Sequence, residues 1–444
     1  MSDFSPKPNG KALLPFAVFL LFYLGLSLWS GDFYAVPMPT AFIAASAAAL
    51  ITGKNSLDEK VGIYARGMGE NNIMLMVLIF ILAGAFAAVA KSSGAVDSAV
   101  LIARHLIPNR LFAAGIFLVS CFISLAIGTS CGTIAALTPI AAGLASSSGI
   151  SAPLMVGAVV GGAMFGDNLS MISDTTIAAT RTQETAMKDK FKVNIKIALP
   201  AALAAVSLYI FAFSSPGVVP APAPLSPRDF LLVLPYVGIL VCALCGMNVM
   251  LLLLAGSVAA LAIGCCCGSF SLLKGIGVAG KGTLDMAETL IVALLAGGLL
   301  GTIRHNGGIA WLIGKIEKSI KSKRNCEFGC ALITILVNLF TANNTVAIVV
   351  AGPVARELSL RYGCDNKRMA AILDSASCVA QGVLPYGAQV LIALGAAKSA
   401  GLFISVNGLI RTLYYPMLLG AALVLFIAIG SFSRNKKKKR CESC

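Results

Sequence analysis

The stretch GTSCGT, residues 128–133, interrupts a long apolar segment with small and polar residues. A second interruption, TANNT at residues 341–345, lies in the second half of the chain. A shift of 214 residues superimposes the two regions without a gap and places Pro139 on Pro353. Matched polar interruptions in two halves of an apolar chain are the best sequence indication of a binding site between duplicated membrane segments.

A further interruption follows in each half, GDNLS at residues 166–170 and QGVLPYG at residues 381–387. The arms around the first interruption of each half are about 14–17 residues long, against the ~20 needed to cross a bilayer. We therefore expect one re-entrant hairpin and one broken helix in each half. The hairpins are predicted at 111–147 and 327–360, and the broken helices at 152–181 and 368–400.

The composition places the whole chain in a membrane. It is 58% hydrophobic and 12% charged, whereas soluble domains carry roughly 25% charged residues. The net charge of +15 is typical of cytoplasmic loops that follow the positive-inside rule, and a nucleic-acid partner is not expected because little folded polar surface is available. The partner surface is the lipid bilayer.

The predicted fold is an all-α polytopic membrane protein with two inverted repeats of five crossings each, containing re-entrant hairpins and broken helices. If both hairpins were true spans, each half would cross six times and the repeats would be parallel. The predicted units are a first repeat at 1–215 (scaffold spans 13–91, final span 194–213), a linker at 216–228, a second repeat at 229–430 (scaffold spans 229–303, final span 407–430) and a basic tail at 431–444.

The distribution of basic residues predicts the orientation. Most of the 34 lysines and arginines, including five between Arg181 and Lys196, fall on the inside when both termini are cytoplasmic. The expected location is the inner (plasma) membrane. With this assignment no lysine or arginine lies in the membrane core.

The hairpin tips are rich in oxygen. Hydroxyls, amides and free helix-end carbonyls suit a hard monovalent cation such as Na⁺, although the same residue types also hold membrane helices together. The candidates are Thr129, Ser130 and Thr133 in the first tip, and Asn343, Asn344 and Thr345 in the second.

Three acids, Asp167, Asp174 and Asp374, stand inside apolar sequence. An ionised Asp at the bilayer centre costs roughly 2.5–3.5 kcal/mol or more, so each needs a cation, a proton or a partner, unless it caps a half-helix. The repeat aligns Asp167 with Gln381, so the two half-sites are expected to differ. The Na⁺ candidates are Thr129, Ser130, Asp167, Asn343, Asn344 and Asp374; Asn168, Ser170, Asp174, Gln381 and Tyr386 complete the candidate cation or substrate site.

No cofactor or enzymatic activity is predicted. Most of the 13 cysteines lie in apolar stretches, where Cys acts as a small hydrophobe, and the terminal pair Cys441 and Cys444 has no further ligands nearby. The sequence also lacks the GxxxxGK[ST] loop of nucleotide-driven pumps.

Three strings resemble the NhaC-type sodium/proton antiporter family of the ion-transporter superfamily. They are FGDNLSMISDTTIAAT (165–180), ANNTVAIVVAGPVA (342–355) and ILDSASCVAQGVLPYGAQ (372–389). Met171 stands where that family often has Pro, and Tyr386 where it commonly has Trp. The resemblance spans roughly residues 60–400. It implies a scaffold domain, a mobile elevator-type transport domain, and a homodimer formed through the scaffold.

Two functional hypotheses follow. The first is a sodium/proton antiporter that exchanges Na⁺ for H⁺ through the intramembrane Asp residues. The alternative is a sodium- or proton-coupled carrier of a small organic solute, a hydroxy- or dicarboxylate or an amino acid, because members of the family also carry such solutes. Substrate, stoichiometry and electrogenicity are left open by the sequence.

Overall fold

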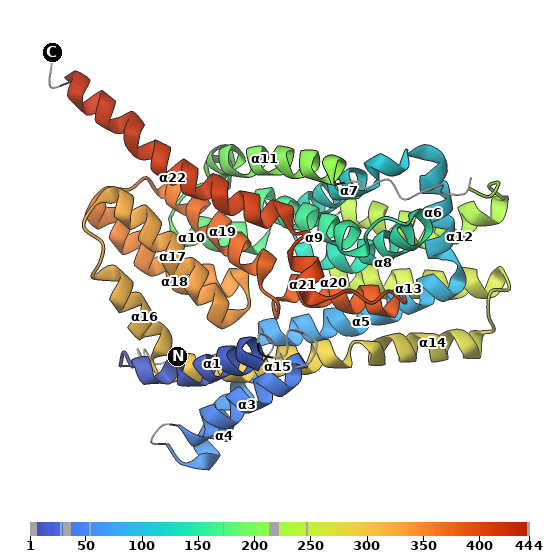
Figure 1. Cartoon of the computed structure of the whole chain (residues 1–444), viewed down its shortest axis with the longest axis horizontal. Helices are drawn as coiled ribbons and strands as arrows, with labels where there is room; N and C mark the ends of the chain where they lie inside the picture. The colour runs from blue at the N-terminus through green and yellow to red at the C-terminus, as the bar shows by residue number, and fades with distance from the viewer. Residues whose placement is uncertain are drawn as a thin grey trace.

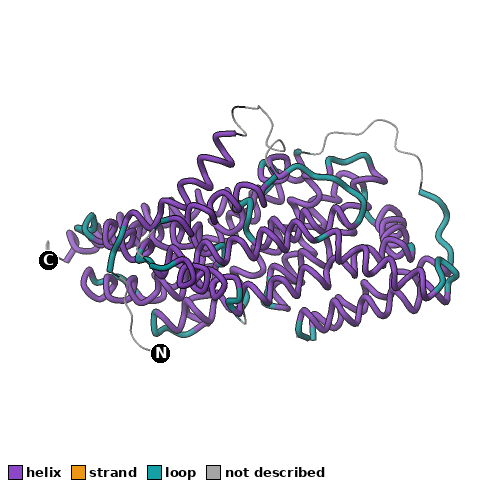
Figure 2. The backbone as a smooth tube through the Cα atoms, turned by 90° about the horizontal axis from the view of Figure 1, so that it is seen from below, coloured by secondary structure: helices purple, strands orange, loops and turns teal. Residues whose placement is uncertain are grey.

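The computed structural model describes residues 7–26, 29, 37–52, 55–171, 173–212, 222–245 and 247–441. Within these ranges the chain forms helices joined by turns and loops, and no strand (Figure 2). The predicted all-α class is confirmed. The helices are η1 (Gly10–Leu13), α1 (Leu14–Leu20), η2 (Leu21–Gly25), α3 (Met38–Ile51), α4 (Leu57–Met68), α5 (Asn71–Ser93), α6 (Ala95–Leu106), η3 (Asn109–Leu111), α7 (Phe112–Ile127), α8 (Ser130–Ser148), α9 (Ala152–Leu169), α10 (Asp174–Thr182), α11 (Met187–Phe211), α12 (Pro227–Leu244), α13 (Val249–Cys266), α14 (Leu272–Asp285), α15 (Ala287–His305), α16 (Gly308–Glu317), α17 (Lys323–Thr341), α18 (Asn344–Tyr362), α19 (Asn366–Val383), α20 (Ala388–Ser399), α21 (Val406–Ile410) and α22 (Tyr414–Cys441).

Many of these helices are apolar enough to lie in a bilayer. Eight segments of the described chain have the length and composition of membrane spans. They are Ile73–Ser93, Asn109–Ile127, Ser130–Ser148, Ala152–Thr182, Met187–Phe211, Val249–Cys266, Ala287–His305 and Asn366–Ser399. The protein is therefore a multi-pass membrane protein.

The 214-residue repeat of the sequence is also a repeat of helix boundaries. Helices α8 and α18 begin and end 214 residues apart, and so do α9 and α19. Each of α8 and α18 contains a proline at the same position, and each ends before a glycine with positive φ, Gly149 and Gly363. The register of the duplication is thus preserved in three dimensions, whereas the inversion and the domain limits stay predictions.

The helices separate into two sets. Helices α1, α3, α4, α5, α13, α14 and α15 pack on one another and form one set. Helices α7 to α11 and α17 to α22 form the other set, and α20 joins the two by packing on both α8 and α5. In Figure 1, α1, α3, α4, α14 and α15 lie along the lower side, below α9, α11, α19 and α22.

Glycines bring the helices of each set into close contact. A Cβ at Gly166 of α9 would lie 2.6 Å from the carbonyl oxygen of Cys121 on α7, and a Cβ at Gly162 would overlap that of Phe117. Small residues four apart allow membrane helices to approach closely. The crossing of α7 and α9 fixes the end of α9 that carries Asp167.

Two helices were not expected from the sequence. Helices α4 and α14 lie at equivalent places in the two halves, where we predicted loops within the scaffold regions. Both are amphipathic, and α4 begins with a capping box, in which Ser56 and Glu59 each bond the other's backbone N–H. Such a box is a recognised sequence signal for a helix start.

Several predicted boundaries require correction. The final span of the first half begins at Met187 rather than 194, and that of the second half is divided into α21 and α22. Helix α22 runs on to Cys441 through most of the predicted basic tail. Residues 442–444, the linker up to residue 221, and parts of the scaffold region predicted at 13–91 lie outside the described residues.

Candidate functional site

Each predicted hairpin tip is a tight turn between two helices. The first turn consists of Gly128, with φ +75°, and Thr129, after which α8 begins. The second consists of Ala342, with φ +46°, and Asn343, whose side chain accepts a hydrogen bond of 3.0 Å from the N–H of Val346. The first residue of the helix that follows each turn, Ser130 of α8 and Asn344 of α18, is buried.

The second turn contains a non-glycine residue in the left-handed region, which costs roughly 1–2 kcal/mol. Ala342→Gly is therefore expected to raise the free energy of unfolding by up to about 1 kcal/mol, and Gly128→Ala to lower it by a similar amount. Thermal unfolding of the two purified variants in detergent measures both effects. A loss of stability in Ala342→Gly would show that the buried methyl group matters more than the backbone strain.

The tips are joined by a chain of buried hydrogen bonds. Ser130 Oγ donates to a carboxylate oxygen of Asp167 (2.8 Å), and Gln389 Nε2 donates to Ser130 Oγ (2.9 Å). Gln381 Nε2 then donates both to Gln389 Oε1 (2.8 Å) and to the carbonyl oxygen of Ala342 (3.0 Å). Residues of α8, α9, α19, α20 and the second tip thus meet, and the repeat partners Asp167 and Gln381 lie in one site.

The same site holds an unused acceptor. Gln381 Oε1 is buried and receives no hydrogen bond, although buried amide oxygens are nearly always paired. The Asp167 carboxylate, Ser130 Oγ, Ala342 O and this amide oxygen are all oxygen ligands, which hard cations prefer. The buried site is therefore lined with oxygen atoms, one of which has no hydrogen-bond donor.

A second buried cluster surrounds Asp374. Lys190 of α11 forms an ion pair with Asp374, and the two side chains are 1% and 0% exposed. Lys190 Nζ also donates to Thr176 Oγ1 (2.7 Å) and to the carbonyl oxygen of Asn168 (2.8 Å). The predictions that Lys190 is a loop cation and that the core contains no base were wrong, because α11 begins one turn or more earlier than expected.

Asn168 connects the two clusters. Its side-chain and backbone oxygens both accept from Asn194 Nδ2 (2.6 and 2.7 Å), and Asn194 Oδ1 accepts from Ser375 Oγ (2.8 Å). Asn168 Nδ2 donates to the hydroxyl of Tyr415 (3.3 Å). Because Asn168 directly follows Asp167, the ion pair on α11 and α19 and the chain of hydrogen bonds between the tips belong to one polar region.

Other candidates lie at its margin or outside it. Ser170 Oγ donates to Leu125 O (3.0 Å), and Thr133 Oγ1 to Thr129 O (3.1 Å). Asp174 is exposed in the first turn of α10, where Ser173 is the cap.

The remaining candidates belong to the second half. Tyr386 packs against Phe19 and Phe42 and donates to Leu339 O (2.7 Å). Asn344 is buried and accepts a hydrogen bond from the N–H of Thr345, which is half-buried.

Gln389, Lys190 and Asn194 belong to this polar region but were not predicted from the sequence. Gln389 is visible as a polar residue two positions after Gly387, at the start of the second arm of a broken helix. Lys190 and Asn194 lie one turn apart on a helix, a spacing that places both on one face. Because the final span was predicted to begin at residue 194, Lys190 was assigned to the basic loop before it, and the spacing of Lys190 and Asn194 on one helix was not recognised.

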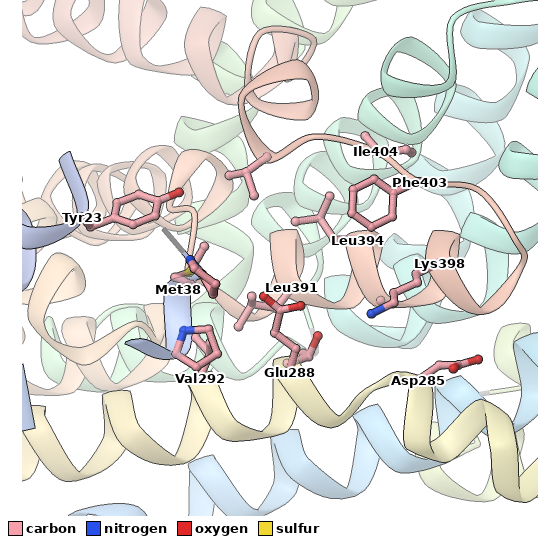
Figure 3. A pocket seen from close by; sticks show the side chains of 15 residues that line it. Tyr23, Met38, Asp285, Glu288, Val292, Leu391, Leu394, Lys398, Phe403 and Ile404 are labelled. Atoms are coloured by element: carbon pink, nitrogen blue, oxygen red, sulfur yellow. The ribbon is translucent and has the colours of Figure 1, made fainter. Parts of the chain in front are cut away.

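A cavity of about 310 Å³ lies between the two sets of helices. It is lined by apolar residues of α15 and α20 and by three charged residues, Asp285, Glu288 and Lys398 (Figure 3). None of its lining residues belongs to the hydrogen-bonded chain at Asp167.

The Na⁺/H⁺ antiporter family matches residues 14–213 and 230–432. The Na⁺/H⁺ antiporter NhaC of Bacillus subtilis (strain 168) is 25% identical over 351 residues, 72% of this chain and 76% of that protein. The malate-2H⁺/Na⁺-lactate antiporter of the same organism is 21% identical over 354 residues, 72% of this chain and 74% of that protein.

A third relative covers more of the chain. The arginine/ornithine antiporter ArcD of Halobacterium salinarum is 24% identical over 427 residues, 86% of each protein. The relatives are therefore all antiporters, with different cargoes. The family match extends over most of the sequence, including both hairpin tips and both broken helices, and the chain belongs to the Na⁺/H⁺ antiporter family.

Proposed function

We propose that this protein exchanges Na⁺ for H⁺ across the membrane, and that the two ions compete for the carboxylate of Asp167. One observation carries the proposal: Asp167 is buried and belongs to no ion pair among the described residues, while Gln381 Oε1 in the same site has no donor. A cation or a proton at Asp167 would supply the charge that the surroundings lack.

The assignment favours Asp167 over Asp374. Both acids are buried, and a buried ionised carboxylate is stable only with a compensating charge. Asp374 already has Lys190 as its partner. The ion-exchanging group is therefore Asp167, and Asp374 with Lys190 holds α19 against α11 beside it.

The arrangement gives a physical reason for obligatory exchange. An ionised Asp at membrane depth costs roughly 2.5–3.5 kcal/mol or more, and either Na⁺ or a proton removes that cost. Movement of the site between the two membrane faces is then favoured when either ion is bound and disfavoured when neither is. Because both ions use the same carboxylate, the protein carries one in each direction rather than both together.

The proposal is tested by transport in proteoliposomes that contain a pH-sensitive dye. An external Na⁺ pulse is expected to make the lumen of wild-type vesicles alkaline, and the apparent Na⁺ affinity is expected to fall as the pH is lowered, because the proton competes. Asp167→Asn, which keeps the size of the side chain, is expected to reduce the initial rate by at least tenfold.

The matched control is Asp189→Asn, which removes an exposed carboxylate of α11 and is expected to keep the wild-type rate. Size-exclusion profiles and thermal unfolding of both variants establish that they are folded. Wild-type exchange in folded Asp167→Asn, or an unchanged Na⁺ affinity between pH 6 and pH 9, would refute the competition at Asp167.

A second candidate function is the coupled transport of a small organic solute. It is supported by the cavity between the helix sets and by the relatives named for malate and lactate and for arginine and ornithine. Uptake of labelled solutes by the same proteoliposomes, with and without Na⁺ and pH gradients, separates the two candidates.

A further inference from the structure

The cavity between the helix sets has the size and lining of a small-molecule site. Its volume of about 310 Å³ is at the lower end of the roughly 300–1,000 Å³ that such sites occupy. The walls include Met38, Val292, Leu391 and Leu394. A solute of about the size of an amino acid would fit it.

Opposite charges face one another across this cavity. Glu288 lies in the first turn of α15 and Lys398 in the last turn of α20. Figure 3 shows the carboxyl group of Glu288 and the ammonium group of Lys398 pointing toward each other. Asp285, at the end of α14, adds a second carboxylate at the rim.

Glu288 and Lys398 are exposed and Asp285 is half-buried, and these charges have no partners in the described part of the chain. Neither Glu288, Asp285 nor Lys398 takes part in any of its ion pairs. An acid at a helix N-terminus and a base at a helix C-terminus each interact favourably with the helix dipole. This interaction explains the position of each charge on its own helix. It does not account for their placement on opposite walls of one cavity.

We propose that this cavity binds a zwitterionic amino acid, with its carboxylate at Lys398 and its ammonium group at Glu288. The apolar residues of α15 and α20 would contact the side chain. Binding here uses no residue of the Asp167 site, so this inference and the exchange of Na⁺ for H⁺ can fail independently.

The test measures ligand-induced thermal stabilisation of the full-length protein in detergent. The probes are the neutral L-amino acids, each added singly, with propionate and ethylamine as ligands that carry one charge each. We expect at least one amino acid to stabilise the protein at millimolar concentration, and propionate and ethylamine to do so more weakly or not at all.

Variants of the two charges sharpen the test. Glu288→Gln and Lys398→Gln are each expected to raise the Kd of that amino acid about tenfold or more, since each removes a charged hydrogen-bond partner. The double exchange Glu288→Lys with Lys398→Glu is expected to regain affinity, because the ligand can bind in the reverse direction. Lys281→Gln, an exposed change on α14 outside the cavity, is the matched control.

Three results would overturn the proposal. The first is that no neutral amino acid stabilises the wild-type protein. The second is that the ligand stabilises Glu288→Gln and Lys398→Gln as strongly as the wild type. The third is that phosphatidylethanolamine, a zwitterionic lipid, stabilises the wild type more than these variants while the amino acids do not, which would assign the cavity to a lipid headgroup. Na⁺-driven pH changes in the same variants show whether exchange is retained.

Discussion

Lys190→Met is expected to lower the free energy of unfolding by about 3–5 kcal/mol, the typical cost of leaving one charge of a buried pair without its partner. Asp374 is fully buried, and Lys190 is its ion-pair partner. The change also removes the donor to Asn168 O and Thr176 Oγ1. Chemical or thermal unfolding in detergent measures the loss.

The converse change should cost less. In Asp374→Asn the ammonium group of Lys190 keeps its two other oxygen acceptors, and an amide oxygen replaces the carboxylate oxygen. The double variant Lys190→Met with Asp374→Asn should regain part of the stability lost in Lys190→Met, because it no longer contains a buried unpaired charge. The coupling free energy of the pair is the change in unfolding free energy of the double variant minus the sum of the changes in the two single variants.

A second ion pair between the same helices provides the control. Lys367 of α19 pairs with Asp189 of α11 at 3.3 Å, but the two side chains are 49% and 38% exposed. Exposed pairs contribute about 0–1 kcal/mol, so Lys367→Met should have little effect. Equal losses in Lys190→Met and Lys367→Met would contradict the structural role given to burial.

Gly162→Ala is expected to cost about 1–3 kcal/mol, the range for overpacking a close interior contact. Its Cβ would overlap the carbonyl oxygen of Phe117, a backbone atom that cannot rotate away. Helices α7 and α9 would have to separate, and Asp167 lies five residues further along α9. We therefore expect the Na⁺/H⁺ exchange rate to fall together with the stability, which unfolding and proteoliposome assays measure in parallel.

Gly115→Ala on α7 is the matched control, because its Cβ would meet no atom within 4 Å. Alanine in place of a helical glycine is expected to add up to about 1 kcal/mol. A stable, fully active Gly162→Ala protein would mean that the crossing of α7 and α9 does not position Asp167.

The sequence predicted the meeting of the two tips because its polar interruptions are strong, local and duplicated. Glycine, asparagine and threonine inside apolar segments indicate either a binding site or a contact between helices. The 214-residue repeat also aligns Asp167 with Gln381, which predicts that the two residues occupy equivalent places. The helix breaks fall within a few residues of their predicted positions for the same reason.

Contacts between helices were harder to predict from the sequence. Lys190 resembles its neighbours Lys188 and Lys192 in sequence, and only the packing of α11 against α19 distinguishes it. Tyr386 was a candidate because it adjoins Pro385, yet its ring packs against two aromatic residues far away in the chain. Neither arrangement leaves a periodic or local pattern. The start of α4, in contrast, carries a capping box, which is a local pattern that the sequence alone displays.

The hydrogen bonds from Gln381 through Gln389 and Ser130 to Asp167 all point the same way, with every donor directed toward the carboxylate. Aligned bonds of this kind polarise one another, so they stabilise the anionic form along their whole length. A proton on Asp167 would compete with the Ser130 hydroxyl for the carboxylate oxygen. If the hydroxyl turned away, the hydrogen bonds of Gln389 and Gln381 would have to change in turn, up to the bond that Gln381 donates to the carbonyl oxygen of Ala342. The protonation state of Asp167 would then change the hydrogen bonding of the turn at Ala342, which lies in the other half of the chain.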